Sequence, residues 1–311
     1  MRLHVPLAAA LACAALPANA SCGSAYCVVN TDWGLQAGQH SSGEWVADLR
    51  YEFIDQKRLW SGSHKTDGDP NADALEQRTL NSNLLATIDH TLTEHWGVRV
   101  DVPVVSRIHD HIADPSGAAV PERWSFTRLG DARVVGRYQF GAYDGFGLNA
   151  GLKLPTGSHT VANDNGTPAE RMLQPGSGTT DAIAGLYFSG RPHDAGMGWF
   201  AQVMVQHALN SRDEYRPGDT LQATAGLRLP LTEKTVGTLQ VNYVQRRRDS
   251  GANAEPDVSG NRSVFLSPGI SIVLSPAVQV YGFLQLPLYR YVNGVQLTAD
   301  RSAVVGVSLR F

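Results

Sequence analysis

Apolar and polar residues alternate along most of this chain, and the pattern is clearest in its last ten residues, 302–311. Counting back in twos, the apolar positions are Phe311, Leu309, Val307, Val305 and Ala303. The residues between them are small or polar, apart from Val304. Such alternation is expected of a β-strand with hydrocarbon on one side and a wet interior on the other. A soluble sandwich strand could alternate in the same way.

The same alternation recurs through the chain in roughly twelve segments, each near the ~10 residues that a tilted membrane strand needs. They lie near residues 44–53, 83–92, 96–104, 132–140, 146–154, 182–188, 199–205, 221–229, 239–243, 264–274, 278–286 and 302–311. A helical period of 3.6 residues is nowhere sustained. The sequence therefore predicts an all-β fold, a transmembrane up-and-down antiparallel β-barrel of about 12 strands.

The connections between these segments alternate between short and long. The short ones are 93–94, 142–145, 191–196, 232–234 and 275–276, and the long ones are 55–78, 108–125, 155–178, 210–218, 247–261 and 289–296. Membrane barrels have tight periplasmic turns and longer extracellular loops, whereas a sandwich has no reason to alternate so regularly. An even number of strands returns both termini to the periplasm.

The N-terminus has the features of a secretory signal. A short basic region is followed by an apolar run at 7–16 and by the small-x-small sequence Ala18-Asn19-Ala20. We expect a signal peptide at 1–20, a periplasmic segment at 21–42 and the barrel at 43–311. No later apolar run approaches the ~20 residues of a membrane helix, and an exported chain without one spans a membrane only as a closed barrel. These features predict the outer membrane of a Gram-negative bacterium.

Three segments carry a family resemblance. They are Gly-Asp-Ala-Arg-Val-Val-Gly-Arg-Tyr at 130–138, residues 148–157 with Lys-Leu-Pro-Thr-Gly, and Pro-Gly-Ser-Gly-Thr-Thr-Asp at 175–181. Together they resemble a family of outer-membrane proteins named for the MetA pathway of phenol degradation. The resemblance implies transport of small hydrophobic or aromatic molecules and supplies no catalytic residues. The ending also resembles the closing strand of bacterial outer-membrane barrels, whose terminal Phe, here Phe311, serves the barrel assembly machinery.

If the apolar positions face lipid, the intervening positions line the lumen. The charged candidates for a constriction are Asp48, Arg50, Arg99, Asp101, Asp131, Arg133, Arg137, Lys153, Asp181 and Arg228. An opposite wall carries uncharged residues, Gln222, Gln240, Asn242, Gln279, Tyr281 and Gln285. Buried charges must be paired or wet. Two interpretations stay open, namely an ion-pair network that fills a narrow barrel and a polar constriction that selects a solute.

Cys22 and Cys27 form an exported pair, for which an oxidising compartment favours a disulfide. Metal binding by their thiolates is the alternative, although no His or further Cys lies close by. His109 and His111 are two residues apart in the second expected long loop. We expect them to form an exposed pair rather than a metal site. No metal or other cofactor is therefore predicted.

These observations favour a passive channel or transporter for a small molecule, in contact with outer-membrane lipid. The formal net charge of −3 gives no indication of a nucleic-acid partner. The alternatives are a non-conducting scaffold or a metal- or redox-linked binding protein that uses the Cys segment. An outer-membrane hydrolase is less favoured. His207 has outward parity near an outer strand end, but no serine within a strand beside it is an obvious nucleophile. We therefore predict that the protein is not an enzyme.

Overall fold

A computed structural model describes residues 42–68, 74–114, 116–140, 145–190 and 196–311. The strands are β1 (Trp45–Gly62), β2 (His64–Lys65), β3 (Ala74–Thr91), β4 (Trp96–Ala113), β5 (Val120–Leu129), β6 (Arg133–Gln139), β7 (Gly145–Lys153), β8 (Asp181–Gly190), β9 (Gly198–Ala208), β10 (Thr220–Pro230), β11 (Thr235–Arg246), β12 (Asn261–Ser275) and β13 (Val278–Arg310). One 3-10 turn, η1 (Pro256–Val258), is the helical structure among these residues. No helix in this part of the chain is long and apolar enough to cross a membrane.

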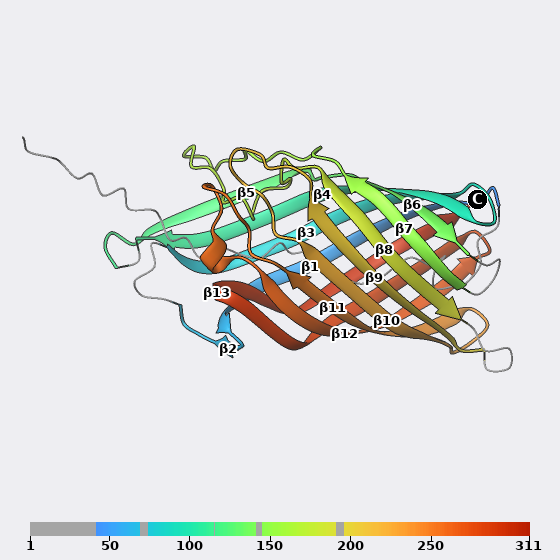
Figure 1. The fold of residues 1–311 in the computed structure, drawn as a ribbon. Coiled ribbons are helices and arrows are strands. Elements are labelled where there is room, and N and C mark those ends of the chain that lie inside the picture. Colours follow the sequence, from blue (N-terminus) through green and yellow to red (C-terminus); the bar gives the residue numbers. More distant parts are fainter. Residues whose placement is uncertain (1–41, 69–73, 115, 141–144, 191–195) are drawn as a thin grey trace, which may run out of the picture.

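The strands form a closed antiparallel barrel (Figure 1). Each spanning strand pairs with its neighbours in sequence, and β13 closes the ring on β1, from Val46 opposite Arg310 onward. The element β13 turns at Gly294, whose φ is 59°, so one arm pairs with β12 and the other with β1. The described ring therefore has eleven elements, or twelve strands when β13 counts as two, with β2 and β5 outside it. The predicted fold class is confirmed.

The alternation of side chains decides which residues face lipid. Leu49, Val100 and Val241 are exposed on the outside, whereas their neighbours Arg50 and Asp101 are buried on the inside. Aromatic rings pair at the end of the barrel that carries the C-terminus, an end that is marked in Figure 1. The ring pairs there are Trp45–His90 at 3.9 Å, Trp96–Tyr138 at 4.8 Å, Phe140–Phe146 at 5.3 Å and Phe188–Trp199 at 4.5 Å. Such a belt is typical of a membrane interface.

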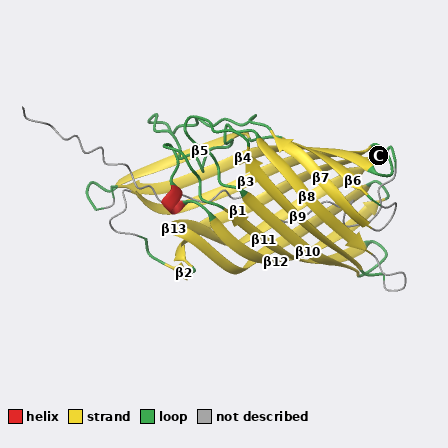
Figure 2. Cartoon of the chain, viewed as in Figure 1, coloured by secondary structure: helices red, strands yellow, loops and turns green. Residues whose placement is uncertain are grey.

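Several strands extend past the others at the end opposite the C-terminus (Figure 2). The predicted loops at 55–78, 108–125 and 289–296 are largely strand, which corrects the predicted strand ends. In these extensions several outward residues are charged and pair across strands. Arg78 Nε lies 2.7 Å from Asp55 Oδ1, Arg123 Nη1 3.3 Å from Asp110 Oδ1, and Arg58 Nε 3.2 Å from Asp300 Oδ2. The polar outer face therefore marks where the hydrocarbon ends, and the strands continue beyond it.

The predicted signal peptide and the cysteine pair Cys22 and Cys27 lie outside the described residues. The described strands run from Trp45 to Arg310, and the division into a signal peptide, a periplasmic segment and a barrel at 43–311 stays a prediction.

Candidate functional site

The connection between β7 and β8, residues 154–180, folds back over the outer mouth of the barrel, and we call it the inserted segment. Arg107 on β4 donates to the carbonyl oxygens of Leu173 at 2.5 Å and Met172 at 3.3 Å. Trp124 on β5 donates through Nε1 to the carbonyl of Thr167 at 2.9 Å. Leu173 also packs with Trp124 and with Leu297 of β13. The segment is thus attached to several strands of the wall rather than projecting into solvent.

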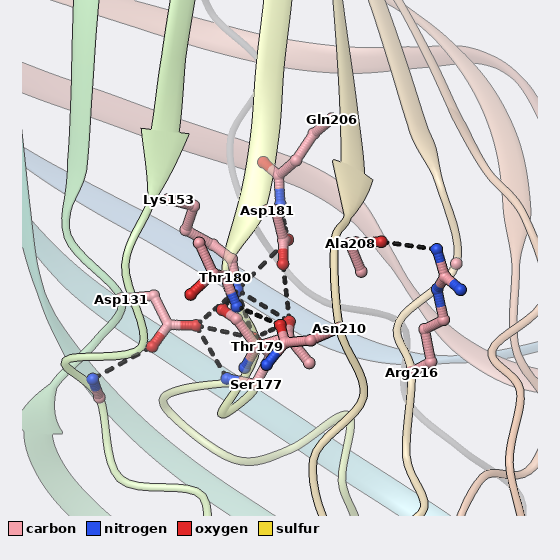
Figure 3. A network of polar contacts seen from close by, with 12 residues as sticks. Asp131, Lys153, Ser177, Thr179, Thr180, Asp181, Gln206, Ala208, Asn210 and Arg216 are labelled. Carbon is pink, nitrogen blue, oxygen red and sulfur yellow. Dashed lines mark hydrogen bonds and ion pairs between the residues drawn. The ribbon is translucent and has the colours of Figure 1, made fainter.

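Lys153 is the centre of a buried ionic cluster that attaches both ends of the inserted segment (Figure 3). Its Nζ lies 2.8 Å from Asp131 Oδ2 and 3.2 Å from Asp181 Oδ2, and it also donates to Ser177 Oγ. Asp131 Oδ1 accepts from the backbone N–H of Gly157 at 3.1 Å. We call Asp131, Lys153, Ser177, Thr179 and Asp181 the Lys153 cluster. It fixes the beginning and the end of the segment to β7 and β8.

Close backbone contact explains the glycine at position 157. A Cβ there would lie within 2.9 Å of backbone atoms of both Gly130 and Gly176. Real Cβ atoms do not approach backbone atoms so closely. Position 157 therefore has to be a glycine for the two ends of the inserted segment to contact the β5–β6 connection.

All ten charged residues predicted for the lumen face the interior. Six are buried, namely Arg50, Asp101, Asp131, Arg137, Lys153 and Asp181, and four are half-buried, namely Asp48, Arg99, Arg133 and Arg228. Further ion pairs join the wall below the inserted segment. Arg137 Nη1 lies 2.9 Å from Asp89 Oδ2, and Arg99 Nε lies 2.8 Å from Asp101 Oδ1. Whether these residues form a constriction that selects a solute stays a prediction.

A cavity of about 360 Å³ lies in the lumen between the wall and the inserted segment. Eight of the ten predicted residues line it; Asp48 and Arg228 do not. The remainder of the lining includes apolar side chains that the charge pattern did not point to, among them Leu85, Val135, Met172, Ile183 and Met204. The cavity can therefore contact both an apolar and a polar part of a small molecule.

The uncharged wall forms a hydrogen-bonded layer. Gln240 and Asn242 are fully buried, and Asn242 Nδ2 donates to Ser267 Oγ at 2.7 Å. Gln222 and Gln285 line the cavity. Tyr281 is buried and donates to Asp48 Oδ1 at 2.8 Å. Part of this wall therefore fills the interior, and part faces the cavity.

His109 and His111 lie on β4, and both are buried, which corrects the predicted exposed pair. The strand continues through them with its inward face covered by the inserted segment. With Glu76 on β3 they form the His109 cluster, whose ligand-type atoms all lie within 4.8 Å of one another. Burial lowers the pKa of His109. Burial would also lower the pKa of His111, but Glu76 and Glu122 outweigh it and raise that pKa.

His207 offers no base for hydrolysis in this arrangement. Its Nδ1 lies 2.7 Å from Asp219 Oδ1, and its Nε2 lies 3.0 Å from Arg216 Nη2. The nitrogen that would take a proton from a nucleophile is therefore occupied by a guanidinium.

Comparisons with known proteins establish the fold. No family model matches the sequence, and no curated protein matches it either. Among solved structures, an outer membrane channel from Pseudomonas putida F1 superposes with a TM-score of 0.66 at 12% identity, over 88% of this chain and 97% of that chain. The CymD monoaromatic hydrocarbon channel gives 0.49 at 11% identity, over 88% and 90% of the two chains. The chain thus has the fold of an outer-membrane channel, as the resemblance implied.

Proposed function

We propose that this barrel is a passive channel of the bacterial outer membrane, in which the inserted segment narrows the passage for a small molecule. The observation that carries the proposal is the cavity of about 360 Å³ enclosed between the barrel wall and residues 154–180. Ligand sites of small molecules begin at ~300 Å³, so the space suits a compact solute. The shared fold with an outer membrane channel supports the same conclusion.

The cavity lining indicates the chemistry of the solute. Met172, Ile183 and Met204 provide apolar contact, whereas Arg133 and Arg137 provide charged donors. We therefore propose a solute with a compact apolar body, such as an aromatic ring, and one polar or acidic group. Uptake into liposomes should be faster for a small aromatic acid than for a sugar of similar size. Equal rates would contradict this choice of solute and leave the channel itself in place.

The channel is tested by current through planar bilayers. The refolded parent protein should show a small conductance, because side chains fill much of a barrel of this strand number. Arg137→Ala should increase cation preference, since it removes a buried positive charge and leaves Asp89 without this partner. Arg133→Ala, at a half-buried position, should act in the same direction if Arg137→Ala folds poorly.

Val134→Ala is the matched control, because Val134 lies between these arginines and faces outward. Its conductance and ion preference should equal those of the parent. Folding of every variant is checked by heat-modifiable gel mobility. A folded parent that carries no current and admits no small solute into liposomes would contradict the channel and favour the non-conducting scaffold.

We also propose that Phe311 presents the barrel to the assembly machinery. Its ring is 71% exposed, while its backbone N–H and carbonyl pair with Trp45. The side chain is therefore available although the backbone is fully used. Phe311→Ala should lower the amount of assembled barrel in cells and leave refolding in detergent unchanged.

A further inference from the structure

The His109 cluster lies on the inner face of the strand extensions, beyond the apolar outer belt. His109 Nε2 lies 3.3 Å from Glu76 Oε2, and His111 Nδ1 lies 3.9 Å from Glu76 Oε1. A tetrahedral zinc site with bonds of ~2.0–2.1 Å has ligand atoms about 3.3 Å apart. The observed spacing is therefore close to that of a metal coordination shell. It arises because His109 and His111, two apart on β4, point to the same face.

Each imidazole already has a partner on its other nitrogen. Thr79 Oγ1 lies 2.9 Å from His109 Nδ1, and Glu122 Oε2 lies 2.9 Å from His111 Nε2. In metal sites, a hydrogen bond from the remote nitrogen fixes the tautomer and directs the other nitrogen to the metal. Here both remaining nitrogens are directed toward the same carboxylate, that of Glu76.

An aromatic side chain closes the cluster on one side. The Trp124 ring lies 5.6 Å from the His109 ring and 4.8 Å from the His111 ring, measured between centroids. Trp124 is itself buried and packs against Ala169 of the inserted segment. The imidazoles are thus held rigidly and shielded from water, which favours a preorganised ligand set over a mobile surface pair.

The inserted segment carries a further buried carboxyl group on this side of the barrel. Glu170 follows Ala169, which packs with Trp124, and both of its carboxyl oxygens are buried. Among the residues that the structure describes, neither oxygen has a hydrogen-bond partner. Glu170 does not belong to the group of ligand atoms that lie within 4.8 Å of one another, so the ligand set consists of Glu76, His109 and His111.

We propose that Glu76, His109 and His111 bind a divalent transition-metal ion of the Zn²⁺ type. Two imidazoles and a carboxylate suit zinc and its neighbours, whereas calcium and magnesium prefer oxygen ligands alone. The bound ion would join β3 to β4 where the inserted segment covers them. The site is independent of the solute passage proposed above.

The test measures Zn²⁺ binding by the refolded full chain in detergent after chelator treatment, by isothermal titration calorimetry. The chain carries no affinity tag and has Cys22→Ser and Cys27→Ser, so that thiolates do not compete. One ion per barrel should bind. Co²⁺ in its place should give the visible absorption of a tetrahedral site with nitrogen and oxygen ligands.

His111→Ala should weaken Zn²⁺ binding by more than about 100-fold, and Glu122→Gln, which changes only the partner of a ligand, by about 10–100-fold. His64→Ala is the matched control, because His64 is an exposed histidine on β2 outside the cluster. It should bind like the parent.

Two results would overturn the site. One is that the folded parent binds Zn²⁺ no more tightly than His111→Ala does. The other is equal loss of binding in His111→Ala and His64→Ala, which would mean that zinc attaches to surface histidines. If His111→Ala does not fold, Glu122→Gln decides the question, because its conservative change leaves both imidazoles in place.

Discussion

Two buried ionic clusters lie where the inserted segment meets the barrel, and they differ in how their carboxylates are satisfied. In the Lys153 cluster, all four carboxylate oxygens of Asp131 and Asp181 accept hydrogen bonds, and an ammonium group lies between them. In the His109 cluster, the carboxylate of Glu76 faces two imidazoles, and nearby Glu170 has two buried oxygens without donors. The Lys153 cluster therefore needs no further ligand, whereas a bound cation would stabilise the His109 cluster.

The largest effect is expected from Lys153→Met. It leaves two buried carboxylates without their cation, which costs about 3–5 kcal/mol in similar cases. The free energy of unfolding, measured by urea titration in micelles, should fall by that amount, and the inserted segment should loosen, so that conductance rises. Lys234→Met, at an exposed lysine in a short turn, is the control and should change neither. If Lys153→Met were as stable as the parent, the Lys153 ammonium group would not be what satisfies the carboxylates of its cluster.

A second change tests whether the loss comes from uncompensated charge. Lys153→Met combined with Asp131→Asn removes one carboxylate charge together with its partner. The double variant should be more stable than the sum of the single changes, by about 1–3 kcal/mol, because the residues share one network. Strict additivity in the same urea titrations would mean that the three side chains act separately.

Zinc should distinguish the clusters directly. At a concentration of 100 times the dissociation constant, a ligand that binds only the folded state stabilises it by about 2.7 kcal/mol. The parent and Lys153→Met should both gain this increment, whereas His111→Ala should not. Addition of a chelator should remove the increment. A gain in His111→Ala equal to that of the parent would place the zinc elsewhere.

The smallest effect is expected from matched amide substitutions without metal. Asp181→Asn weakens charge-assisted hydrogen bonds to Lys153, Thr179 and Gln206, so stability should fall by about 1–3 kcal/mol. Glu170→Gln replaces a buried carboxyl group that has no donor by a neutral amide of the same size, so stability should stay the same or rise by up to about 1 kcal/mol. If the two substitutions change the unfolding free energy in opposite directions, the difference between the two clusters is supported. A loss of stability in both variants would contradict it.

The sequence predicted the barrel and the interior charges because lipid imposes a simple rule on each strand. Alternation identified Arg50 and Asp101 as inward residues, since hydrocarbon requires apolar neighbours such as Leu49 and Val100. The rule stops at the membrane surface. Beyond it polar residues occur on both faces, so the regular alternation is lost and the continuation of β4 through His109 looked like a loop.

The position of the inserted segment could not be predicted from the alternation of apolar and polar side chains. Residues 154–180 carry no periodicity, and their position depends on specific contacts such as those of Lys153 and Arg107. The burial of His109 follows from those contacts rather than from its neighbours in sequence. The one local signal was the density of glycine around 157 and 176–178, which predicted turns but not the return of the chain to the barrel.

The joint between β13 and β1 has a consequence for how the protein folds. The N–H of Trp45 donates to the carbonyl of Phe311 at 2.9 Å, and the N–H of Phe311 donates to the carbonyl of Trp45 at 3.0 Å. These partners begin and end the described ring, so closure joins strands that are far apart in sequence. Contacts so distant in sequence make folding slow. Before closure, two strand edges carry unpaired backbone groups that hydrocarbon does not tolerate, so ring closure and insertion into lipid are coupled.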